Sequence, residues 1–185
     1  MNAGKSIVLL QASHNYAERG MQTCLLTAQF DNRAGAGRIE SRIGIGADAD
    51  TYAPDDDLFA RLAARLAAGP CACVFVDEAQ FLTPAQVWQL ARAVDDLGLP
   101  VMCFGLRVDF RGELFPGSAA LLALADEMRE VRSICHCGKK GDDGGAQGRR
   151  GPGADRWRAG DDRWQRALRI PVPPPLAPGD QNWHG

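Results

Sequence analysis

The apolar stretch Cys71-Ala-Cys-Val-Phe-Val76 runs directly into two acids, Asp77 and Glu78. A short apolar run without a helical period predicts a strand that is buried on both faces of a parallel sheet. Strand-like runs also lie at 23–27 and 101–104, and helical patterns lie at 58–67 and from 84 to about 98. Strands that alternate with helices in this way predict an α/β fold, with a parallel sheet covered by helices on both faces.

A phosphate-binding sequence opens the chain. Met1-Asn-Ala-Gly-Lys-Ser6 matches the second half of the loop G-x-x-x-x-G-K-[ST], and the apolar run Ile7–Leu10 then leads into a predicted helix. In such loops the backbone amides and the lysine bind phosphates, and the hydroxyl ligates Mg²⁺. We therefore expect Gly4, Lys5 and Ser6 to bind ATP, and the strand that precedes a complete loop to be missing. A chance match in an unstructured N-terminus is the alternative.

The two acids after the 71–76 strand supply the second half of a nucleotide site. An aspartate at the C-terminal end of a strand that faces a P-loop holds Mg²⁺, and a neighbouring carboxylate can accept a proton from a substrate hydroxyl. We assign Asp77 to the metal and Glu78 to the general base. Asp31 and Arg33 are the next candidates, because an arginine near a phosphoryl group stabilises developing charge. Solvated acids at a strand-to-helix turn are the alternative reading.

Composition narrows the class of protein. The 185 residues are 45% hydrophobic, which is enough for the core of one domain, and a net charge of −2 argues against a nucleic-acid or membrane binder. The sequence contains neither a transmembrane run nor a signal peptide, so we expect a cytoplasmic protein with reduced thiols. Four cysteines in strand-like runs are expected to be buried as small hydrophobic residues: Cys24, Cys71, Cys73 and Cys103.

Taken in order, six segments resemble bacterial thymidine kinases of the zinc-containing, P-loop type. They are Met1–Ser6, Phe30–Arg33 with Ser41–Gly44, Val76–Phe81, Gly105–Phe115 and Ile134–Gly138. The resemblance covers residues 1 to about 140 and implies a RecA-like P-loop NTPase sheet and a homotetramer. It also implies transfer of the ATP γ-phosphoryl group to the 5′-hydroxyl of thymidine, which gives dTMP in pyrimidine salvage. An inactive nucleotide-binding remnant and an ordinary P-loop ATPase are the alternatives.

The resemblance also implies roles for individual residues. Glu78 would be the general base, and Ser6 and Asp77 would serve Mg²⁺. The residues around ATP and its phosphates would be Met1, Asn2, Ala3, Gly4, Lys5, Ser6, Arg33, Asp77, Glu78, Ala79 and Gln80. The residues that wall the thymidine pocket would be Phe81, Leu106, Phe110 and Phe115. Without the resemblance, aromatic residues in apolar stretches are more often core residues.

A half-site for zinc follows the predicted kinase domain. Cys135 and Cys137 resemble the first two ligands of the family's structural zinc site, with His136 as a spacer. The chain has no later cysteine, so four ligands could be reached only if His136 or His184 substituted as a ligand. We therefore expect an α/β domain over residues 1–134, half of a zinc-binding lasso domain over residues 135–140, and a disordered tail over residues 141–185.

The tail has an unusual composition. Residues 141–185 contain nine glycines, six prolines and three of the four tryptophans, but no lysine, glutamate, serine or threonine, unlike ordinary linkers. Codons can be chosen for 141–147 so that the next reading frame gives Ala-Thr-Met-Val-Ala-Gln, and codons for 162–176 so that it gives a Cys-x-x-His pair. Both resemble family sequence. We therefore hypothesise a one-base insertion near the codons for Lys140 and Gly141, which DNA sequencing would test.

Overall fold

The computed structural model describes residues 4–29, 37–41, 43–131, 133–134 and 140–141, and every structural statement below concerns these residues. Its main sheet contains four parallel strands in the order β4-β1-β5-β6. These strands are β1 (Thr23–Ala28), β4 (Asp50–Tyr52), β5 (Cys73–Val76) and β6 (Val101–Cys103). The predicted parallel α/β sheet is therefore confirmed, and β5 lies at its centre between β1 and β6.

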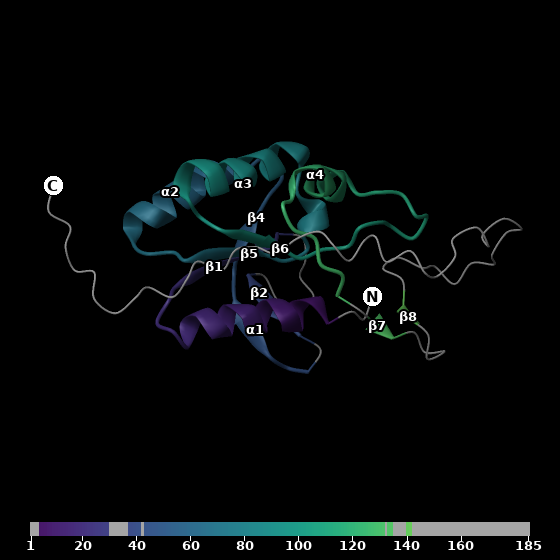
Figure 1. Ribbon diagram of the computed structural model, residues 1–185, viewed down its shortest axis with the longest axis horizontal. Helices are drawn as coiled ribbons and strands as arrows, with labels where there is room; N and C mark the ends of the chain where they lie inside the picture. Colours follow the sequence, from purple (N-terminus) through teal and green to yellow (C-terminus); the bar gives the residue numbers. More distant parts are fainter. Residues whose placement is uncertain (1–3, 30–36, 42, 132, 135–139, 142–185) are drawn as a thin grey trace, which may run out of the picture.

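Helices cover both faces of this sheet. Figure 1 shows α1 (Lys5–Ala17) on one side, with α2 (Leu58–Ala68) and α3 (Pro84–Leu97) on the other. The helix α4 (Pro116–Leu124) packs against α3 and against the short 3-10 helix η1 (Ala79–Phe81). This three-layer arrangement explains why the central strand is wholly apolar, because both of its faces are covered.

Local sequence signals define the ends of two helices. Asp57 caps α2, since its carboxylate accepts a hydrogen bond from the backbone N–H of Ala60. Thr83 and Gln86 form a reciprocal capping box at the start of α3, with Pro84 in the first turn, and Gly98 ends the helix in the left-handed conformation. Side-chain caps of this kind each contribute about 1 kcal/mol to helix stability. The predicted bounds of α3 are confirmed within one residue.

Two hydrophobic clusters lie on opposite faces of the sheet. Side chains of β1 and β5, including Leu26 and Val76, pack with α2 and α3 in the larger cluster. Phe75 faces α1 in the smaller cluster with Leu9, and its ring meets Tyr16 edge-on at a centroid distance of 5.9 Å. The predicted helix after the phosphate-binding sequence is thus confirmed, and its packing against β5 fixes Gly4–Ser6 beside the end of that strand.

The four cysteines of the sheet region are free thiols. Cys24 and Cys73 are buried, as predicted, whereas Cys71 and Cys103 are only partly buried. Burial raises the pKa of the Cys24 thiol to about 11 and that of the Cys73 thiol to about 12. Thiols with such pKa values are protonated at neutral pH and act as small hydrophobic side chains.

The Gly-rich, polar segment before α2 contains strands that no sequence pattern predicted. β2 (Arg38–Glu40) and β3 (Gly46–Asp48) form an antiparallel hairpin, and β4 then joins the main sheet beside β1. A second antiparallel pair joins β7 (Ser133–Ile134) to β8 (Lys140–Gly141). The predicted domain bounds beyond residue 134 remain a prediction.

Candidate nucleotide-binding and catalytic site

A hydrogen bond joins the N-terminal loop to the end of the central strand. Gly4 has a positive φ of 64° and precedes α1, so Lys5 and Ser6 lie in the first turn of that helix. The Ser6 hydroxyl donates to Oδ2 of Asp77, the residue after β5, at 3.1 Å. The two halves of the nucleotide site predicted from the sequence, which are 71 residues apart, are therefore in direct contact.

Asp77 has the chemistry of a magnesium ligand. Its side chain is only 4% exposed, and burial together with the nearby Glu78 charge raises its pKa, against smaller opposing effects from the Glu78 N–H, Ser6 and Lys5. A carboxylate that is costly to ionise in isolation gains most from a bound cation. A hydroxyl and a carboxylate are oxygen ligands of the kind that Mg²⁺ prefers, so these two residues fit the ion.

The described residues contain no group of three or more His, Cys, Asp or Glu side chains that could hold a metal. The part of the chain that contains Cys135 and Cys137 lies outside the described residues, so their predicted zinc half-site remains a prediction.

Glu78 has a constrained backbone. Its φ of 51° places it in the left-handed region, where an ordinary residue is strained by roughly 1–2 kcal/mol. The Tyr52 hydroxyl donates to the Glu78 carbonyl at 3.0 Å, and the Glu78 N–H donates to Oδ1 of Asp77 at 3.0 Å. Strain that is held by buried hydrogen bonds is typical of functional residues. In this conformation the proposed base and the proposed metal ligand are adjacent.

A buried amide continues the contacts beyond Glu78. Gln80 in η1 donates from Nε2 to Oε2 of Glu78, and its Oε1 accepts from the Leu106 N–H at 3.0 Å. The Ser118 hydroxyl in α4 donates to the Leu106 carbonyl at 2.6 Å. Both backbone polar groups of Leu106 are thereby held by side chains, and the segment that starts there is anchored to the acidic end of β5.

The structure brings two of the four residues expected at the nucleoside into contact and holds a third, Leu106, through its backbone to Gln80 and Ser118. Phe81 and Phe115 meet edge-on at a centroid distance of 5.9 Å, and Leu106 is partly buried beside Gln80. Phe110 lies apart, since it is 69% exposed within the turn that the Val108–Leu114 bridge closes. The Arg111 guanidinium lies 5.2 Å from the Phe110 ring centre, which is a cation–π contact at the surface.

Several predicted site residues lie outside the described residues, and for them the sequence assignment remains a prediction. They are Met1, Asn2, Ala3, Asp31, Arg33 and the cysteines of the zinc half-site, Cys135 and Cys137.

Sequence reasoning missed four residues that shape the site: Tyr52, Gly105, Gly117 and Ser118. Tyr52 is 2% exposed and lies in a polar stretch, where no periodicity indicates a buried strand. A Cβ on Gly117 would lie 2.5 Å from the Leu82 carbonyl oxygen, and one on Gly105 would lie 2.8 Å from Oε1 of Gln80. The Gly-Leu-Arg and Pro-Gly-Ser sequences could have signalled turns, but not these close contacts.

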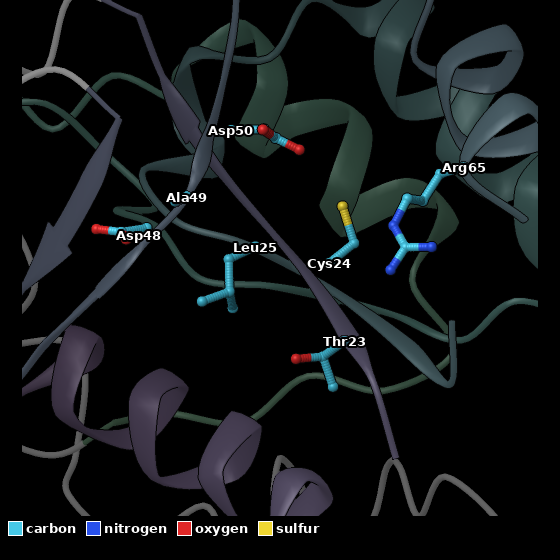
Figure 2. A pocket seen from close by; sticks show the side chains of 7 residues that line it. All are labelled: Thr23, Cys24, Leu25, Asp48, Ala49, Asp50 and Arg65. Carbon is cyan, nitrogen blue, oxygen red and sulfur yellow. The ribbon is translucent and has the colours of Figure 1, made fainter. Parts of the chain in front are cut away.

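A separate pocket of about 260 Å³ lies along β1. Figure 2 shows its lining residues, which come from the first half of β1, from the β3–β4 segment and from α2: Thr23, Cys24, Leu25, Asp48, Ala49, Asp50 and Arg65. β4 pairs only with Leu26–Ala28, so the first half of β1 has no β4 neighbour on this side. The pocket shares no residue with the Ser6–Asp77–Glu78 site.

The fold and site define a class of protein. A parallel sheet, a Gly-Lys-Ser helix start and an acidic strand end in contact with that serine are the features of a P-loop nucleotide-binding protein.

Comparison with known proteins narrows this class to one family. A family model described as thymidine kinase matches residues 1–143. A thymidine kinase of Jannaschia sp. (strain CCS1) is 76% identical over 153 residues, which cover 79% of this chain and 78% of the relative. The chain belongs to the thymidine kinase family.

Two further relatives carry the same description. A thymidine kinase of Ruegeria pomeroyi is 75% identical over 140 residues, which cover 76% of this chain and 71% of the relative. One of Agrobacterium fabrum is 61% identical over 140 residues, which cover 76% of this chain and 72% of the relative.

Within the described part of the chain, no helix is both long and apolar enough to span a bilayer.

Proposed function

We propose that this chain transfers the γ-phosphoryl group of ATP to the 5′-hydroxyl of thymidine, giving dTMP. The observation that carries the proposal is the 3.1 Å hydrogen bond from Ser6 to Asp77, with Glu78 directly beside it. This contact joins the phosphate-binding turn, the metal-ligand carboxylate and the candidate base at one edge of the sheet. Phosphoryl transfer requires mainly that such groups are positioned and that negative charge is neutralised.

Each residue at this edge has a role that follows from its chemistry. Lys5 lies in the first turn of α1, where its ammonium and the free backbone N–H groups favour phosphate oxygens. Ser6 and Asp77 would hold Mg²⁺, which, when bound, neutralises charge on the phosphates. Glu78 would accept the proton of the nucleoside hydroxyl as that oxygen bonds to the γ-phosphorus of ATP, while the bond from this phosphorus to the β,γ-bridging oxygen breaks and ADP leaves.

The nucleoside is proposed to lie against the aromatic pair and the segment that begins at Leu106. Phe81 and Phe115 would offer ring faces and edges to a base, and Phe110 is assigned to the same pocket by resemblance to the family. A base pocket needs apolar walls together with a few fixed polar groups. Met1, Asn2, Ala3, Arg33 and Ala79 complete the proposed ATP contacts by resemblance to the family.

The remaining assignments are also proposals by resemblance. We propose a cytoplasmic homotetramer that carries Zn²⁺ as a structural ion. Cys135 and Cys137 supply two suitable sulfur ligands, which is half of the four that tetrahedral zinc needs, and no part of the phosphoryl-transfer argument uses them.

The test is an assay of ATP-dependent thymidine phosphorylation by the full chain. Glu78→Gln should lower kcat by about 10²–10⁴-fold, because general-base catalysis contributes that much, and ATP binding should persist. Glu18→Gln is the matched control, since Glu18 is an exposed carboxylate at the far end of α1. ATP binding without turnover in the unchanged chain would support an inactive remnant, and ATP hydrolysis that is independent of thymidine would support an ordinary ATPase.

A further inference from the structure

The Gln80 side chain is a buried link between two parts of the site. Gln80 is 2% exposed, so each of its polar atoms must find a partner within the protein. A carboxylate only accepts hydrogen bonds and a backbone N–H only donates them. The bonds to Glu78 and Leu106 therefore determine the orientation of the amide, with Nε2 toward the acid and Oε1 toward the backbone.

The link is closely packed on the side of the nucleoside segment. A Cβ on Gly105 would lie 2.8 Å from Oε1 of Gln80 and 2.9 Å from its backbone nitrogen. The next residue, Leu106, is held from its other side by the Ser118 hydroxyl. Movement of the Leu106 backbone would therefore displace the amide, and the amide in turn contacts the Glu78 carboxylate.

Backbone and side chain of Glu78 are held by different groups. Tyr52 and Asp77 bind its carbonyl and its N–H, whereas Gln80 binds Oε2 of the carboxylate. Removal of the amide would leave the Glu78 backbone in place while the carboxylate loses this contact. A misplacement of about 1 Å at a reacting group can cost roughly 100-fold in rate.

We propose that Gln80 is a positioning residue, which orients the Glu78 carboxylate and makes that orientation depend on the position of the Leu106 backbone. A nucleoside that binds against the Leu106 segment would therefore fix the orientation of the base. This inference rests on the proposed function. It gives Gln80 a role in addition to the phosphate contact that the family resemblance implies, which remains a prediction, because the printed bonds use one donor and one acceptor of the amide.

The experiment uses two substitutions that separate the two bonds. Gln80→Met keeps the length of the side chain and removes both hydrogen bonds. Gln80→Glu keeps an acceptor for the Leu106 N–H and replaces the amide donor with a second acid, which repels the Glu78 carboxylate when both are ionised. We expect both variants to lower kcat by about 10–100-fold with an unchanged KM for ATP. Only Gln80→Met should also raise the KM for thymidine.

Two controls distinguish positioning from a loss of structure. Gln86→Met removes another buried amide, which binds the Ala53 and Asp56 carbonyls away from the acids, and should lower stability without lowering kcat. In a Glu78→Gln background, Gln80→Met should have little further effect on kcat, because the residue acts through Glu78.

The outcomes separate this inference from the proposed function. Failure of the unchanged chain to phosphorylate thymidine overturns both. Turnover that depends on Glu78, combined with normal kcat in both Gln80 variants, overturns the positioning role alone. The positioning role is also overturned if Gln80→Met lowers kcat by the same factor in the Glu78→Gln background as in the unchanged chain, since that would indicate a general structural effect. If Gln80→Met does not fold, Gln80→Glu still decides the question: a lowered kcat with a normal KM for thymidine supports the positioning role, and a normal kcat overturns it.

Discussion

Gly117 lies where the nucleoside segment meets the end of the central strand, and a single added methyl group tests that contact. It is the second residue of α4, next to Pro116, and the helix packs against η1. A Cβ would lie 2.5 Å from the Leu82 carbonyl oxygen and 2.9 Å from those of Ala79 and Gln80. All three neighbours are backbone atoms, which cannot turn away as a side chain can.

The expected loss of stability can be worked out from these contacts. Overpacking typically costs about 1–3 kcal/mol, and separating α4 from η1 would weaken the hydrogen bond from Ser118 to Leu106 by up to about 1 kcal/mol. Alanine also restricts the unfolded chain, which offsets about 0.5–1 kcal/mol. Gly117→Ala should therefore lower the free energy of unfolding by roughly 2 kcal/mol, the middle of a range from about 0 to about 3.5 kcal/mol.

Urea unfolding measures this loss, and steady-state kinetics measure its functional effect. Because α4 holds Leu106 and follows Phe115, the KM for thymidine should rise while the KM for ATP stays constant. Gly69→Ala is the matched control, since a Cβ there meets only the flexible Arg65 side chain at 3.7 Å and its φ of 164° is extended. Equal stability of the two variants would refute the reasoning from close contact.

Two further predictions concern the metal site and the buried thiols. Ser6→Ala should raise the Mg²⁺ concentration needed for half-maximal activity, whereas Ser6→Thr keeps the hydroxyl beside Asp77 and should not; equal Mg²⁺ dependence in the two variants would exclude the serine as a ligand. The pKa values of Cys24 and Cys73, about 11 and 12, exceed the ordinary value of 9.0, so stability is fully present below pH 9 and is lost as pH rises toward those values. Each thiol contributes up to about 1.4 kcal/mol per pH unit to this loss of stability in that window. The Cys24→Ala, Cys73→Ala double variant should show a shallower alkaline loss in urea unfolding, and an unchanged slope would contradict this.

Much of the fold could be predicted because its signals are local. The apolar run before Asp77, the Thr83–Pro84 helix start and the helix after Ser6 depend on hydrophobic burial and on capping within a few residues. The strand β4 could not be predicted, because Tyr52 is its one fully buried residue and it pairs with β1 only after the chain has folded back.

The sequence by itself determined the kind of chemistry at the site: a phosphate-binding turn, two adjacent acids and an order of motifs that indicated the family. Tertiary structure decided which groups act together. The contact of Ser6 with Asp77 depends on the packing of α1 against β5, and the link from Glu78 through Gln80 to Leu106 depends on the approach of Gly105. Residue types are recorded along the chain, but hydrogen bonds between distant residues exist only after close packing has brought their atoms together.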